Sequence, residues 1–185
     1  VPLTWKELKP FIPLQENFLN PRIYGSIHGI SHSARVILFA ALLSTKFNEP
    51  MNPGVLVAAG YHDLRRKKDT LDEGHQKRAA NWIIRSKIPL SPHILSEASE
   101  ILTRSEKDNF DVRVKIVRDA DALDRFRLPA ERWWPKKEFL TKQGIALLEF
   151  AKYFTWKSES QIPRLGKIGA IRKTAIEIGI IREDE

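Results

Sequence analysis

Hydrophobic residues recur at helical spacing along nearly the whole chain, and no segment alternates apolar and polar residues as a half-buried strand would. Because amphipathic helices bury their apolar faces against one another, this periodicity predicts an all-α fold. Glycine and proline are scattered along the 185 residues rather than clustered, so no domain boundary is indicated. We therefore expect a single helical bundle over residues 1–185, with its C-terminal helices within 137–183.

Residues that cap helices mark several of the expected helix starts. Thr4 and Glu7 have the spacing of a capping box, and Asn52 followed by Pro53 is typical of a first helical turn. Prolines interrupt the residues before 27, which therefore form a broken helical lead-in. The further candidate caps are Ser31 or Ser33, Asp72, Ser91 and Asp111. These signals predict a helix that ends near residue 47, followed by helices over about 53–63, 73–86, 92–104, 112–127, 137–154 and 168–181.

The chain is basic, with a formal net charge of +8 and an isoelectric point of about 9.8. A basic balance suits anionic partners such as nucleotides and phosphate esters, although an ordinary basic surface explains it equally well. No expected helix separates a basic stripe from an acidic face, so we do not expect the protein to bind nucleic acid.

Two further features exclude whole classes of protein. The longest apolar run, residues 36–43, is too short to cross a bilayer, and the N-terminus lacks a secretory signal, so we expect a cytoplasmic protein without a membrane span. The chain has no cysteine, which excludes disulfides, thiolate metal ligands and cysteine nucleophiles. Any metal ion must then be bound by histidine, aspartate or glutamate, a donor set that favours an open hydrolytic site.

The adjacent pair His62 and Asp63, near the end of an expected helix, is the strongest sign of a metal site. Neighbouring side chains on a helix point about 100° apart, so they reach one ion only from a helix end or an irregular turn. An imidazole nitrogen and a carboxylate oxygen suit a borderline divalent ion such as Mn, Zn, Ni or Fe. His32 on the preceding helix and Asp119 or Asp121 on a later helix are candidates for the remaining ligands, as in a bundle-core metal site.

The order of these residues resembles the HD superfamily of metal-dependent phosphohydrolases. The matching pieces, within about residues 27–127, are His32-Ser33-Ala34-Arg35-Val36, Tyr61-His62-Asp63-Leu64 and Asp119-Ala120-Asp121-Ala122-Leu123-Asp124. The resemblance implies an HD-type helical bundle whose metal ligands are His32, His62, Asp63 and Asp121. It favours Asp121 over Asp119 because a small residue and then leucine follow Asp121, and it implies a supporting or structural role for Asp124.

A narrower resemblance, to a poorly described HD subgroup, involves two more histidines. It rests on Ile27-His28-Gly29-Ile30-Ser31-His32, His62-Asp63-Leu64-Arg65-Arg66 and Asp72-Glu73-Gly74-His75. It implies that His28 and His75 act at the site, as ligands, in substrate contact or as proton donors, although structural roles stay open for both. Members of the subgroup carry a further histidine before the last aspartate, and residues 101–104 contain none, which departs from the pattern of a two-metal site.

The resemblance also implies a reaction. It predicts hydrolysis of a phosphate ester, of a nucleotide or a related small molecule, by water activated on a divalent Mn, Ni, Fe, Zn, Co or Mg ion. Arg65, Arg66, Arg35 and Arg125 are the candidate phosphate contacts, with Arg65 or Arg66 offsetting charge in the transition state. The alternative is a non-catalytic HD-type module that binds a metal or a nucleotide. Trp133 and Trp134 are expected to pack in the core or a lid, or else against a nucleobase.

Overall fold

The computed structural model describes residues 3–104, 110–132 and 140–183, and it confirms the all-α fold. The α-helices of this part of the chain are α1 Trp5–Leu8, α2 Ile30–Lys46, α3 Pro53–Tyr61, α4 His75–Arg85, α5 Pro92–Arg104, α6 Val112–Leu123, α7 Lys142–Ala146 and α8 Leu148–Glu177. Short 3₁₀ helices cover Lys9–Phe11, Gln15–Asn17, Ile23–Gly25, Asp124–Arg127 and Ala130–Arg132. None of the described helices is both long and apolar enough to span a membrane.

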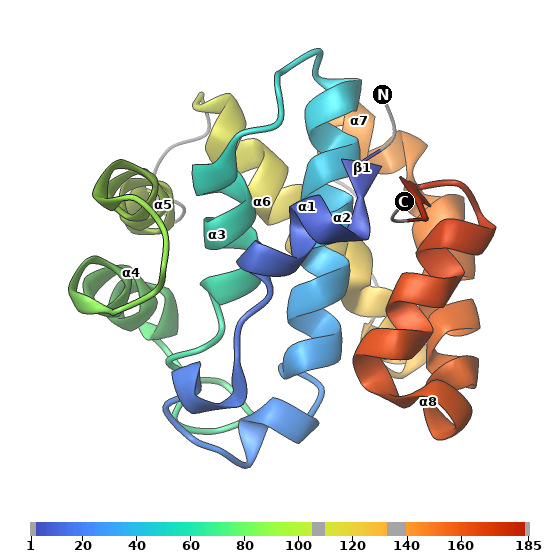
Figure 1. The fold of residues 1–185 in the computed structure, drawn as a ribbon, viewed down its shortest axis with the longest axis horizontal. Coiled ribbons are helices and arrows are strands. Elements are labelled where there is room, and N and C mark those ends of the chain that lie inside the picture. Colours follow the sequence, from blue (N-terminus) through green and yellow to red (C-terminus); the bar gives the residue numbers. More distant parts are fainter. Residues whose placement is uncertain (1–2, 105–109, 133–139, 184–185) are drawn as a thin grey trace.

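Helix α2 is the central element of the molecule. It runs between α3 and α6 on one side and α8 on the other, while α4 and α5 form the outer edge beyond α3 (Figure 1). Fourteen of its 17 residues are buried, because neighbouring helices cover it on nearly every side. Most of its apolar side chains belong to one core cluster together with Leu56, Ile83, Ile101, Ile116 and Phe154 of the surrounding helices.

The local sequence signals predict four helix starts correctly. Thr4 forms a complete capping box with Glu7 at the start of α1. The Asn52 side chain accepts a hydrogen bond from the backbone N–H of Val55 at 3.1 Å, and Asp111 caps α6 in the same way. Helix α5 begins at Pro92, as expected.

Two of the expected caps are wrong. Helix α2 begins after Gly29, which offers no side-chain cap, and Ser31 and Ser33 are buried within its first turns. Helix α4 begins at His75 after Gly74, whose φ of 71° is left-handed. Asp72 does not cap it, because the Asp72 carboxylate instead accepts hydrogen bonds from the backbone of Lys67 and from Arg78.

The C-terminal half also differs from the expectation. Helix α6 ends at Leu123 and continues as a 3₁₀ helix, and the two expected C-terminal helices are replaced by α7 and the long α8. Helix α8 runs through Pro163 and kinks at Gly166, where φ is 71° and ψ is 168°. The expected start at residue 137 and the pair Trp133 and Trp134 lie outside the described residues.

A minimal parallel pair of strands joins the two ends of the described chain. Strand β1, Leu3–Thr4, pairs with strand β2, Ile181–Arg182, with Leu3 opposite Ile181. In Figure 1 the pair lies beside α2 and α8. The remaining described backbone is helical or irregular, so these strands do not alter the fold class.

Candidate metal centre

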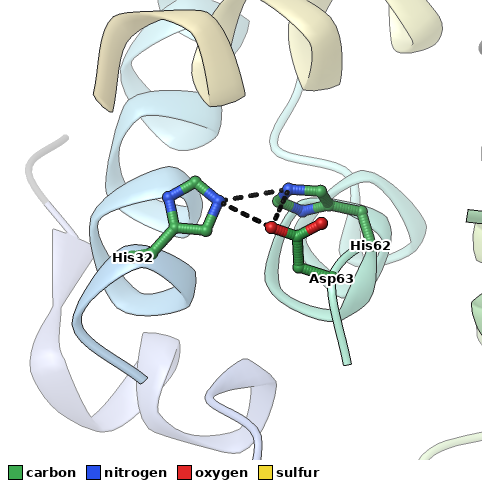
Figure 2. A group of neighbouring side chains, drawn as sticks. All are labelled: His32, His62 and Asp63. Carbon is green, nitrogen blue, oxygen red and sulfur yellow. Dashed lines mark hydrogen bonds and ion pairs between the residues drawn. The ribbon is translucent and has the colours of Figure 1, made fainter. Parts of the chain in front are cut away.

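Four side chains from three packed helices converge at the middle of the bundle. His32 is in the first turn of α2, His62 and Asp63 follow the end of α3, and Asp121 is in the last turn of α6. Figure 2 shows the rings of His32 and His62 and the carboxylate of Asp63 pointing toward one another. Helix α3 ends at Tyr61, so His62 and Asp63 lie in the irregular turn that two adjacent ligands require.

The donor atoms of this group form a compact cluster. The two Nε2 atoms of His32 and His62 are 3.2 Å apart. Oδ2 of Asp63 is 3.5 Å from Nε2 of His32, and Oδ1 of Asp121 is 3.3 Å from the same atom. His32, His62 and Asp63 are buried, while the side chain of Asp121 is 43% exposed. The cluster is therefore enclosed by the core and reaches solvent on the α6 side.

Hydrogen bonds made by the Nδ1 atoms of His32 and His62 determine which nitrogen of each ring carries the lone pair. Nδ1 of His32 donates to the carboxylate of Asp124 at 2.8 Å, and Nδ1 of His62 donates to the carbonyl oxygen of Ala59 at 2.8 Å. Each neutral imidazole with a protonated Nδ1 has its lone pair on Nε2. Two lone pairs then face each other at 3.2 Å, an arrangement that needs a proton or a cation between them.

A first-row metal ion fits this spacing. Nitrogens bound at about 2.1 Å to one ion are about 3.0–3.4 Å apart for coordination angles from ~90° to tetrahedral. The observed 3.2 Å falls within that range. Metal-bound histidines usually donate their other N–H to a carboxylate or a backbone carbonyl, as His32 and His62 both do. The residues present therefore fit a divalent ion held by two imidazoles and one or two carboxylates.

The charges around the cluster favour a positive charge at its centre. Burial lowers the pKa of His62, but the carboxylates of Asp63 and Asp121 outweigh it and raise that pKa to about 9. Burial opposes ionisation of Asp63 and Asp121 too, yet the pKa of each is held below its usual value by the imidazoles. Without a metal ion, a proton on His62 supplies the positive charge that the carboxylates attract.

Asp124 and Arg35 support the cluster from behind. Arg35 is fully buried, and its Nε donates to Asp124 at 2.5 Å while another nitrogen donates to Glu159 at 2.5 Å. Burial would raise the pKa of Asp124, but Arg35 lowers it to about 2. Asp124 is thus an ionised acceptor for His32, in the supporting role expected of it. Arg35, expected to contact phosphate, is already committed to these two carboxylates.

Asp119 is not part of the cluster. Its Oδ2 accepts hydrogen bonds from the backbone and the hydroxyl of Thr141, and its side chain is buried. Burial raises the pKa of Asp119. Of the two candidate aspartates, the structure brings Asp121 to the histidines and turns Asp119 toward the start of α7.

Arg66 and His75 cover the other oxygen of Asp63. Nε of Arg66 donates to Oδ1 of Asp63 at 2.7 Å, and Nε2 of His75 is 3.1 Å from the same oxygen. Nδ1 of His75 donates to the carbonyl oxygen of Asp72 at 2.7 Å, which again leaves Nε2 facing the cluster. Both residues therefore contact a candidate ligand directly.

A cleft of about 700 Å³ opens beside these two residues. His28 and His75 line it, together with three basic and three acidic side chains: Arg66, Lys77, Arg132, Asp69, Asp72 and Glu73. Nδ1 of His28 is 2.6 Å from Asp69, and burial lowers the pKa of His28. The cleft has the volume of a small-molecule site and lies next to the candidate metal ligands.

No family model, curated protein or solved structure matches the chain. Membership of the HD superfamily therefore stays a prediction from the motif residues. The geometry described above is independent of that resemblance, because it follows from hydrogen bonds and distances within this chain.

The structure does not bring every expected residue to the site. Arg65 lies with its guanidinium over the ring of Trp82, 5.1 Å from the ring centre, and donates to the backbone of Asn17. Arg125 lies in the 3₁₀ turn after α6 and lines neither the cleft nor the donor cluster. Lys77 and Arg132 line the cleft although no motif contains them, and only the tertiary packing identifies them.

Proposed function

We propose that this protein is a divalent-metal-dependent phosphohydrolase that cleaves a phosphate ester of a nucleotide or a related small molecule. The observation that carries the proposal is the pair of Nε2 atoms, 3.2 Å apart, fixed by hydrogen bonds at both Nδ1 atoms and flanked by Asp63 and Asp121. A scaffold has no reason to bury such polar groups facing one another, since each costs free energy unless it is paired.

A divalent ion bound there would supply a Lewis acid that lowers the pKa of water toward neutrality and polarises a phosphoryl oxygen. His32, His62, Asp63 and Asp121 would hold it, with Asp124 orienting the ring of His32. The open side at Asp121 gives solvent access.

The cleft supports an anionic substrate. Arg66 lines the cleft and is bonded to Asp63, and its guanidinium can also donate to a phosphoryl oxygen and offset charge that develops in the transition state. Lys77 and Arg132 are the other basic residues of the cleft, while two of its three carboxylates, Asp69 and Asp72, are paired with His28 and Arg78. His28 or His75 would donate a proton to the leaving oxygen, because both line the cleft and a protonated imidazole is a general acid.

The test is a phosphoester screen with protein loaded with Mn, Ni, Co, Zn, Fe or Mg. The substrates are a generic aryl phosphate and mono-, di-, tri- and cyclic nucleotides. We expect metal-dependent release of phosphate or of a nucleoside, reduced to background by Asp121→Asn, which changes a half-exposed ligand rather than the core. Binding of metal and nucleotide without cleavage would instead identify a non-catalytic module.

A further inference from the structure

A second cavity, of about 540 Å³, lies away from the cleft and shares no lining residue with it. The N-terminal segment around residues 6–17 forms one wall. Tyr61, at the end of α3, and residues 82–89, at the end of α4, form the other. Its volume is in the range of small-molecule sites, and the metal-site chemistry does not use it.

The interior of this cavity is mainly apolar and is rigidly built. Pro10, Ile12, Ile88 and Pro89 line it together with two aromatic residues. The rings of Tyr61 and Trp82 stack on each other with centroids 6.4 Å apart and an interplanar angle of 21°. Because each ring supports the other, the apolar wall is formed before any ligand arrives, which reduces the entropy lost on binding.

Two hydrogen-bond donors inside the cavity have no acceptor in the described part of the chain. Tyr61 is only 3% exposed, and its hydroxyl makes no hydrogen bond to a described residue. The indole N–H of Trp82 is likewise without an acceptor among the described residues. Neither atom is a buried donor without a partner, so both are open to solvent and free to donate to a ligand in the cavity that accepts hydrogen bonds.

The charges at the mouth indicate the sign of that ligand. Lys6, Lys9 and Lys87 line the cavity, against a single carboxylate, Glu16. Lys9 and Lys87 are exposed and form no ion pair with a described residue. A ligand with an apolar body and one negative group would match the interior and the mouth together, whereas inorganic phosphate would leave the apolar walls uncovered.

We propose that this cavity is a second ligand site, which binds a small organic anion made of a flat apolar body and a carboxylate. The body would lie against the apolar walls, and the carboxylate would accept hydrogen bonds from the Tyr61 hydroxyl or the Trp82 indole near Lys9 and Lys87. The site goes beyond the phosphohydrolase function and shares no residue with the candidate metal ligands.

The test compares two probes of the same shape, 1-naphthoate and its uncharged amide, by protein NMR on the full chain. We expect naphthoate to shift the indole N–H signal of Trp82 with one-to-one stoichiometry at concentrations below about 1 mM. We expect it to bind at least about fivefold more tightly than the amide, because charge-assisted hydrogen bonds are stronger than neutral ones.

A charge-matched pair of variants makes the test specific. In Lys9→Gln/Lys87→Gln the advantage of naphthoate over the amide should disappear. In Lys46→Gln/Lys142→Gln, which removes the same charge from exposed lysines elsewhere, it should persist. Equal affinity for both probes, shifts confined to the cleft lined by His28 and His75, or no binding would overturn the proposal. None of these readouts depends on a metal ion or on turnover.

Discussion

At the scale of single residues, metal binding depends on the hydrogen bonds that orient the two histidine rings as well as on the histidines themselves. The carboxylate of Asp124 fixes the ring of His32, and the carbonyl of Ala59 fixes the ring of His62. These bonds determine which nitrogen can bind an ion. Substitution of a residue that hydrogen-bonds to a candidate ligand should therefore affect metal binding.

Asp124→Asn should lower metal affinity about 10–100-fold, because an amide cannot hold the His32 ring as an ionised carboxylate does. Competition with a chromophoric chelator measures the affinity. Glu159→Gln is the matched control, since Glu159 also pairs with Arg35 but does not touch His32. Equal losses in the two variants would mean that Arg35 burial, rather than ring orientation, is responsible.

The raised pKa of His62 predicts how the metal-free protein responds to pH. The folded pKa of about 9 exceeds the ordinary value of 6.5, so protonated His62 stabilises the fold fully below pH 6.5. That stabilisation is lost as pH rises through 9. Urea unfolding in the presence of a chelator should therefore show a lower free energy of unfolding at pH 9 than at pH 6.5.

Metal affinity should change in the opposite direction over the same range. Binding displaces the proton of His62, so apparent affinity should rise about tenfold per pH unit and level off above the pKa of about 9. Titrations at several pH values measure this slope. An affinity that is flat between pH 6.5 and 9 would show that His62 is not a ligand.

At the scale of elements, the backbone of residues 23–24 packs closely against Gly29 at the start of α2, and this contact holds His32 in place. A Cβ added at Gly29 would lie 2.2 Å from the carbonyl oxygen of Tyr24 and 2.4 Å from that of Ile23. Both are backbone atoms that cannot rotate away. The start of α2, three residues before His32, would therefore have to shift.

Gly29→Ala should reduce the free energy of unfolding by about 1–3 kcal/mol and weaken metal binding. Gly169→Ala is the control, because its Cβ would meet only the Cβ of Leu165 at 3.5 Å, an ordinary contact. In a helix that change should be neutral or stabilise by up to about 1 kcal/mol. Thermal unfolding with and without metal measures both. An unchanged free energy of unfolding in Gly29→Ala would contradict the close contact between Gly29 and the carbonyl oxygens of Ile23 and Tyr24.

The starts of the helices show how much of the fold could be predicted from the sequence. The starts of α1, α3 and α6 depend on caps two or three residues away, and Thr4, Asn52 and Asp111 predict them correctly. Asp72 fails as a cap because Lys67 and Arg78, which only the folded loop brings near, take its oxygens.

In the candidate site, too, some features could be predicted from the sequence and others depend on the tertiary structure. Motif order places His32, His62, Asp63 and Asp121 together without any structure. The direction of an arginine depends on distant neighbours, so nothing local shows that Arg65 turns toward Trp82 and not toward the cleft.

At the scale of the whole molecule, the candidate ligands come from α2, α3 and α6, which pack on one another. An ion bound by all three would connect them, and it would bind only the folded chain. Metal should therefore stabilise the fold by about 2.7 kcal/mol when free metal is roughly 100 times its Kd. Calorimetry with metal and with chelator measures the shift in Tm, and Asp121→Asn should abolish it. An equal shift in that variant would place the ion elsewhere.

The most direct test of the metal centre is elemental analysis of protein purified without chelator, beside an Asp63→Ala variant whose helical content is checked by circular dichroism. The account predicts a stoichiometric first-row metal in the wild-type protein and its loss from the folded variant. Wild-type protein that contains no metal even after soaking, or a folded variant that retains the same metal content, would contradict the proposed centre.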